Sequence, residues 1–352
     1  MSGEASPARW RRSLGQPLRR LLQLAFAVAV VVLLWRALRV PRWADLGRLI
    51  ATADARYVAL GMALLVARYL IWTLRWRLAL RCLGPLPHLL HSFFTVVGAV
   101  CANGFTPTAP VVGGLLRARH AAGEGNRTFG RVYGVVLFDQ LAHQTVITLT
   151  GVLAVIGVAL WYRRVGVAVA LALALLAAVV AFATWLARLD EARVERIGGW
   201  LERWRGDRDV GTLAAIHEHV RESLRVAHRL LRERWLRRAA LLLGVAYVLV
   251  NALALWAFFR SLGHPVDLLT AWLAVTVGVI AGGFTGTPGG VGTTEAGMAI
   301  ALVAMDVPEL EAAAATLLYR GLHYVVVLAL GAPALVLLEA RLRRRALAGE
   351  AT

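Results

Sequence analysis

The chain has 352 residues, of which 59% are hydrophobic, and its mean hydropathy is +0.64. All 39 basic residues are arginine, which gives a formal net charge of +18 and excludes phosphate-loop and Schiff-base sites that need a lysine. The arginines flank apolar runs of about 20 residues, the length that crosses a bilayer, so the charge indicates membrane topology and anionic lipid rather than nucleic acid.

The apolar runs predict an all-α polytopic membrane protein. The first run, 20–38, follows a basic tail and lacks a small-residue cleavage site, so we expect an uncleaved first span. Two shorter runs each end in a break rich in Gly, Pro and Thr, and we expect both to form re-entrant helical hairpins, at 89–105 and 268–285. With the first run there are then about six full spans, the others being at 57–76, 132–160, 165–187, 239–259 and 311–338.

The distribution of arginine sets the expected orientation. With both termini cytoplasmic, 29 arginines lie inside and 8 outside, while Arg68 and Arg320 fall within spans. Arg68 lies seven residues before Arg75, so its side chain is expected to snorkel towards the surface. We therefore expect a multi-pass protein of the bacterial inner membrane. It has a cytoplasmic basic tail at 1–19, a transmembrane domain at 20–340 with a cytoplasmic insert at 188–238, and a cytoplasmic C-terminal tail at 341–352.

The insert at 188–238 is the one sizeable soluble piece. Apolar side chains at helical spacing predict an amphipathic helix lying on the cytoplasmic membrane surface, and they are Leu213, Ile216, Val220, Leu224 and Leu231. The alternative is a docking site for a protein partner or for anionic headgroups.

The two breaks resemble each other. The first reads NGFTPTAPVVGGLLRA from Asn103 and the second GGFTGTPGGVGTTEA from Gly282, so that Arg117 falls opposite Glu295 when one gap is allowed. Three full spans separate the breaks, and an odd number places the copies in opposite orientations. This predicts an inverted repeat, about 57–160 and about 239–338, of the kind that places a transport site between broken helices.

These features resemble the lysylphosphatidylglycerol synthase transmembrane family, also called the flippase-like domain family, over roughly 20–340. The most specific match is TPGGVGTTEAG from Thr287, and the others are the first break and a late-span arginine, here Arg320. Many relatives carry an acidic residue beside the first glycine motif, where this chain has Gly114 and Leu115. The synthase members append a soluble transferase domain, so this chain resembles the membrane half only.

The breaks and the resemblance together give a set of candidate substrate-binding residues. Glycines and prolines expose backbone amides and carbonyls in such breaks, and threonine or asparagine side chains either satisfy that backbone or contact substrate. The candidates are Asn103, Thr106, Pro110, Gly113, Arg117, Asp139, Thr285, Thr287, Pro288, Gly289, Gly290, Gly292, Glu295 and Arg320.

Four of these candidates are charged, and each has a structural alternative. Glu295 is an acid at membrane depth, which is costly unless it faces a cavity or a partner; it either contacts substrate or caps the second hairpin, and Arg320 is its expected partner. Arg117 either joins an interior site or is a surface topology charge. Asp139 comes from the resemblance, with a bond to Gln140 or a neighbouring helix as the alternative.

Three classes of function remain open. The resemblance implies a transporter that moves a phospholipid or lipid-linked headgroup, anionic or zwitterionic. The alternatives are a lipid-modifying transferase and a non-catalytic membrane partner of such an enzyme. No catalytic constellation, nucleotide site or cofactor motif stands out, and His88 and His91 lack the further ligands of a metal site.

Overall fold

The computed structural model describes residues 43–105, 111–124, 127–161, 210–285 and 288–349. Outside this part lie the predicted spans at 20–38 and 165–187, the N-terminal tail 1–19 and residues 350–352 of the C-terminal tail. The described helices form two halves with the same order, in which a long helix, two short helices and a second long helix follow one another. The first half comprises α3 (Ala55–Arg81), α4 (Leu89–Phe105), α5 (Val111–Glu124) and α6 (Phe129–Trp161). The second half comprises α10 (Arg234–Ser261), α11 (Leu268–Thr285), α12 (Thr293–Val303) and α13 (Glu309–Gly349). The remaining elements are α2 (Trp43–Ala51), α9 (Val210–Arg232) and the 3₁₀ turn η1 (Pro288–Gly290).

The predicted helices are present wherever the structure describes them. The apolar runs at 57–76, 132–160, 239–259 and 311–338 lie within α3, α6, α10 and α13, respectively. Each helix is longer than its apolar run, because residues beyond the run are also helical. Asp54 caps α3 by accepting from the Arg56 N–H at 2.8 Å, and its own N–H donates to the Ser261 carbonyl at the end of α10. The start of α3 is thus fixed to the end of α10.

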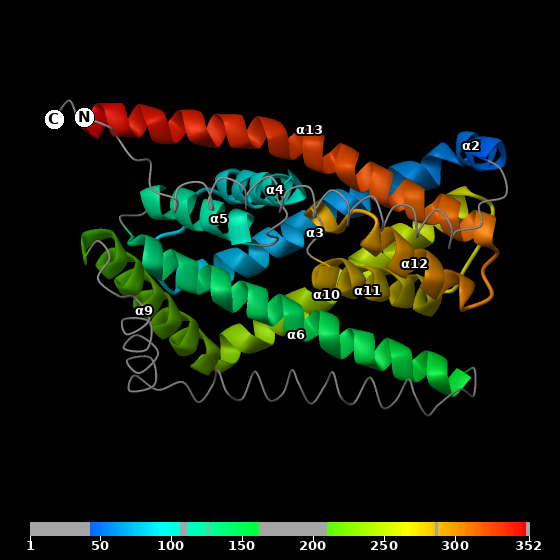
Figure 1. The fold of residues 1–352 in the computed structure, drawn as a ribbon, viewed down its shortest axis with the longest axis horizontal. Coiled ribbons are helices and arrows are strands. Elements are labelled where there is room, and N and C mark those ends of the chain that lie inside the picture. Colours follow the sequence, from blue (N-terminus) through cyan, green and yellow to red (C-terminus); the bar gives the residue numbers. More distant parts are fainter. Residues whose placement is uncertain (1–42, 106–110, 125–126, 162–209, 286–287, 350–352) are drawn as a thin grey trace, which may run out of the picture.

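The two halves also pack in equivalent ways. In each half the short helices form a hairpin, α4 with α5 and α11 with α12, and the second short helix packs on the long helix that follows it. Between the halves, α3 packs along α10, α4 along α13, and α11 against α6. In Figure 1, α13 and α6 lie on opposite sides of the molecule with the short helices between them. Equivalent helices of the two halves thus make equivalent contacts, which agrees with an internal repeat. The opposite orientation of the two copies in a membrane stays a prediction.

The surface of the long helices is apolar. Among the described residues, three helices are long and apolar enough to cross a membrane, namely Ala55–Arg81, Arg234–Ser261 and Glu309–Arg344. Large side chains on them point away from the protein, with Leu242, Val336 and Leu337 each more than half exposed. Soluble proteins seldom expose so much contiguous apolar surface, so these faces fit contact with lipid chains.

The α9 helix lies within the predicted insert, and the face that packs on the protein lies beside the predicted apolar stripe. Val220 is 38% exposed, whereas Ser223, Ala227 and Leu230 are buried. The buried face packs on the first turns of α6, where a β-carbon on Gly134 would lie 2.6 Å from the Ser223 carbonyl oxygen. Val226, Leu230 and Leu231 join the apolar cluster at the start of α6, so from residue 210 onwards the insert includes a helix docked on the protein.

Candidate functional site

The second break is built by glycines. After α11 the chain forms η1 and then enters α12 through Gly289, Gly290 and Gly292, whose φ values of 60°, 68° and 86° are in the left-handed region. Residues with a β-carbon rarely adopt this conformation. The Gly292 N–H donates to Glu295 Oε2 at 2.7 Å, so the acid caps the first turn of α12, which is the structural role expected as an alternative.

The same carboxylate forms the predicted ion pair with Arg320. Arg320 Nε donates to Glu295 Oε1 at 2.7 Å, and the two side chains are only 9% and 14% exposed. The Arg320 guanidinium also donates to the Gly289 carbonyl oxygen at 3.0 Å and to the Tyr324 hydroxyl. One arginine on α13 therefore ties together η1, α12 and its own helix.

The first break meets the second. Asn103 Oδ1, at the end of α4, accepts from the Gly113 N–H at 2.7 Å, so this side chain satisfies backbone at the start of α5. The turn η1 packs on α4. A β-carbon on Gly289 would lie 3.3 Å from the Gly104 Cα atom and 3.7 Å from the Tyr324 hydroxyl. The end of α4 and the turn η1 therefore lie together beside the Glu295–Arg320 pair.

Arg117 belongs to a different ion cluster. Its Nη1 donates to Asp139 Oδ2 at 2.7 Å, and Arg75 Nε donates to Asp139 Oδ1 at 2.7 Å. The Trp72 indole donates to the same Oδ2 at 2.8 Å. All three ionic side chains are at most 3% exposed. Arg117 is thus neither a surface topology charge nor a partner of Glu295, and Asp139 bonds to neighbouring helices, as its structural alternative proposed.

The two ion clusters occupy equivalent places in the two halves. Arg117 on α5 pairs with Asp139 on α6, and Glu295 on α12 pairs with Arg320 on α13. Each pair joins the second short helix to the long helix that follows, but the acid and the base are exchanged. This explains why Arg117 aligned opposite Glu295 in the sequence.

Arg68 is buried rather than snorkelling. It is 5% exposed and donates through Nη1 to Asn251 Oδ1 at 2.7 Å and to the Tyr319 hydroxyl at 3.1 Å. Its Nη2 donates to the Tyr69 hydroxyl at 2.9 Å and contacts the His323 ring. Hydropathy cannot detect this role, because a single arginine in an apolar run has the same hydropathy whether its side chain turns towards the protein interior or towards the surface.

Sequence reasoning also missed two α3 residues of the site, Arg75 and Trp72. Neither residue is among the candidates named from the sequence. The available signal was spacing, because Arg68, Trp72 and Arg75 recur at intervals of four and three and so lie on one helix face.

Several predicted site residues cannot be placed. Thr106, Pro110 and Thr287 lie outside the described residues, and Thr285 and Pro288 are located only by the backbone of α11 and η1. Within the part that the structure describes, no three His, Cys, Asp or Glu side chains gather as a metal site would require.

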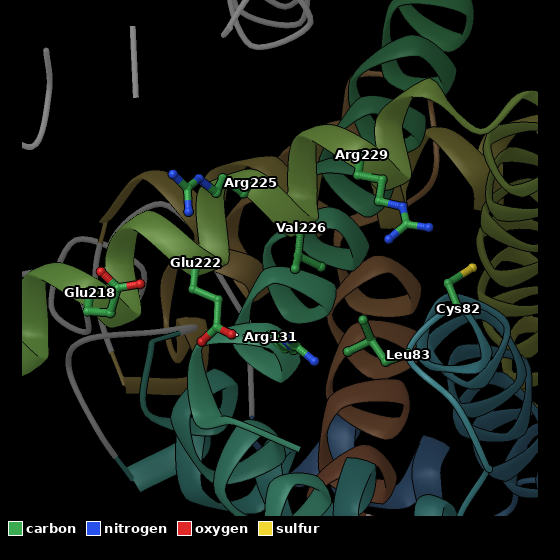
Figure 2. A pocket seen from close by; sticks show the side chains of 8 residues that line it. All are labelled: Cys82, Leu83, Arg131, Glu218, Glu222, Arg225, Val226 and Arg229. Atoms are coloured by element: carbon green, nitrogen blue, oxygen red, sulfur yellow. Dashed lines mark hydrogen bonds and ion pairs between the residues drawn. The ribbon is translucent and has the colours of Figure 1, made fainter. Parts of the chain in front are cut away.

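A cavity lies apart from both ion clusters. It measures about 510 Å³ and lies where the end of α3 and the start of α6 face α9 (Figure 2). Arg131 Nε donates to Glu222 Oε1 across it at 3.0 Å. Burial raises the pKa of the Cys82 thiol at its rim, with the Glu233 carboxylate adding to the effect. The lining residues are Cys82, Leu83, Arg131, Glu218, Glu222, Arg225, Val226 and Arg229.

The fold and its interior define a class, namely a helical membrane protein with buried ion pairs between its helices. A model of the family described as the lysylphosphatidylglycerol synthase TM region matches residues 21–331, and the chain belongs to that family. It is 22% identical over 303 residues to the UPF0104 membrane protein MJ1595 of Methanocaldococcus jannaschii, covering 85% of this chain and 89% of that protein. The resemblance inferred from the breaks is confirmed, and the chain is a multi-pass membrane protein.

Proposed function

We propose that the protein moves a lipid headgroup across the membrane between its two halves. The observation that carries this proposal is the close approach of Gly104 at the end of α4 to Gly289 in η1, beside the buried Glu295–Arg320 pair. A headgroup cannot cross hydrocarbon unaided because it would lose its hydration. Broken helices can replace that hydration with backbone groups and paired charges.

The ion pair suits a headgroup that bears both an amine and a phosphate. Such a headgroup can exchange partners with Glu295 and Arg320, so that the amine binds the carboxylate while the phosphate binds the guanidinium. Every charge then stays paired during the exchange, which avoids the cost of stranding one in a low dielectric. The family is named after lysylphosphatidylglycerol, a lipid with both groups, so a zwitterionic or aminoacylated phospholipid is the proposed substrate class.

The test uses purified protein in liposomes that contain a trace of fluorescent phosphatidylethanolamine, with a quencher added outside. Wild-type protein is expected to increase the quenched fraction over time, and Glu295→Gln to slow that increase without changing insertion. Glu339→Gln is the matched control, because Glu339 lies on the surface of α13 and pairs with Arg119. If neither zwitterionic, anionic nor polyprenyl lipids respond to the protein, with or without a proton gradient, the transporter proposal is wrong, and a role as partner of a lipid-modifying enzyme replaces it.

A further inference from the structure

The buried charges on α3 are not balanced. Asp139 is the only carboxylate that Arg75 and Arg117 contact among the described residues, so two positive charges face one negative charge and the cluster carries +1. Glu295 and Arg320, by contrast, balance each other. Arg68 contacts only neutral groups in the described part of the chain. Burying an unbalanced charge is expensive unless a ligand of opposite sign offsets it.

Arg75 has hydrogen-bonding capacity that nothing in the described protein uses. Its Nε is taken by Asp139, but its Nη1 and Nη2 are buried and have no partner, although the side chain is only 1% exposed. The indole nitrogen of the next residue, Trp76, is likewise buried without a partner. All these atoms are donors. Leaving buried donors unsatisfied costs stability, so the pattern indicates a missing acceptor.

The two free nitrogens of Arg75 form one edge of the guanidinium. This edge presents two N–H groups side by side, which matches two oxygens of a phosphate in a bidentate contact. A phosphodiester carries one negative charge and would bring the +1 cluster to neutrality. Arg68 lies two helical turns away on the same helix and provides a second positive charge along the path.

We propose that Arg75 and Arg117 form a site for a phosphate group, with Asp139 as the resident counter-ion and Arg68 as the next positive charge along α3. The inference rests on the proposed function, since it gives the phosphate of the headgroup a second position on α3, in addition to its exchange with Arg320. A soluble phosphate shares the same chemistry, and the experiment separates the two sources.

Binding is measured as the rise in thermal unfolding temperature of the detergent-solubilised full chain. The probes are short-chain phosphatidylglycerol and, separately, inorganic phosphate, each compared with chloride at equal ionic strength. Wild-type protein should gain about 4 °C at a hundredfold excess over the dissociation constant. Arg75→Gln should weaken binding by about tenfold, because a bond to a charged group is lost. Arg119→Gln, which alters an exposed arginine on α5, should bind like wild type.

A second variant keeps the proposal testable if Arg75→Gln does not fold. Asp139→Asn removes the resident counter-ion, so the stabilisation by phosphate should increase above that of wild type. Loss of binding in Arg75→Gln together with a gain in Asp139→Asn supports the site, because a purely structural ion cluster would lose stability in both variants with no change in phosphate response. An equal response in Arg75→Gln and wild type, or no gain in Asp139→Asn, overturns it.

The choice of probe and the lipid assay distinguish the remaining outcomes. A response to phosphatidylglycerol assigns the site to a headgroup, and a response to inorganic phosphate alone assigns it to a soluble anion; both support the phosphate site. If wild type moves lipid but shows no Arg75-dependent binding, the inference fails while the transport function stands. If phosphate binds through Arg75 but no lipid moves, the transport function fails while the site stands.

Discussion

The Glu295–Arg320 pair gives a prediction whose size follows from its surroundings. Both side chains are nearly buried and lie 2.7 Å apart. Removing one partner of a buried pair costs about 3–5 kcal/mol, because the other charge stays without compensation. Arg320 keeps two neutral acceptors, Gly289 and Tyr324, when Glu295 is changed to glutamine. Glu295 keeps only the Gly292 N–H when Arg320 is changed.

We therefore expect unequal losses. Glu295→Gln should cost about 3 kcal/mol of unfolding free energy and Arg320→Gln about 4–5 kcal/mol. The double variant has no stranded charge, so it should cost less than the sum, with a coupling energy of about 2–3 kcal/mol. The measurement is denaturant unfolding in detergent, followed by circular dichroism.

A control cycle uses an exposed pair on neighbouring helices. Arg119 Nη1 lies 2.9 Å from Glu339 Oε1, but the two side chains are 56% and 34% exposed. Its coupling energy should be below about 1 kcal/mol, because solvent screens exposed charges. Strictly additive losses at Glu295 and Arg320, matching this control, would refute the reasoning.

Three further predictions concern the break, the insert and the topology. Gly290→Val should abolish lipid transport in protein that still reaches the membrane, because the φ of Gly290 is 68° and a β-carbon there would lie 2.5 Å from the Thr294 hydroxyl of α12. The control Gly47→Val, on open surface, should leave transport unchanged. Normal transport in Gly290→Val would show that the break is only a loop. Gly134→Val should separate α9 from α6 and expose the insert to limited proteolysis, and unchanged cleavage would count against the packing. Single cysteines in a cysteine-free background should label from outside at Gly263 and only from inside at Gly206; external labelling of the latter would contradict the orientation.

The helices could be predicted from sequence because the cause is local. A run of apolar residues of bilayer length folds into a helix wherever the backbone must satisfy itself, and α3, α10 and α13 follow this rule. The glycine break before α12 could also be located, because few residues other than glycine adopt positive φ. The capping of Gly292 by Glu295 follows from spacing alone, as the acid is three residues on.

Partners could be predicted only in part. The pairing of Glu295 with Arg320 could be expected from sequence, but the partner of Arg117 could not, because it depends on which long helix packs beside α5. The contact of α9 could not be predicted for a related reason. Its apolar stripe includes the exposed Val220, but the contact with α6 depends on Gly134, whose missing side chain lets Ser223 and Val226 approach.

The exchanged charges of the two halves lead to a last prediction. The first half holds arginine on α5 and acid on α6, so the fold accepts either order at this place. A variant combining Glu295→Arg with Arg320→Glu should therefore fold, losing about 2–4 kcal/mol because the cap on Gly292 and the Arg320 bonds to Gly289 and Tyr324 disappear. Glu295→Arg alone places two arginines together and should be far less stable. In liposomes the exchanged pair should move an amine-bearing lipid more slowly, because the amine would meet the acid on the wrong helix. If the double variant unfolds as readily as Glu295→Arg alone, the two ion pairs are not equivalent, and the structural case for the repeat is weakened.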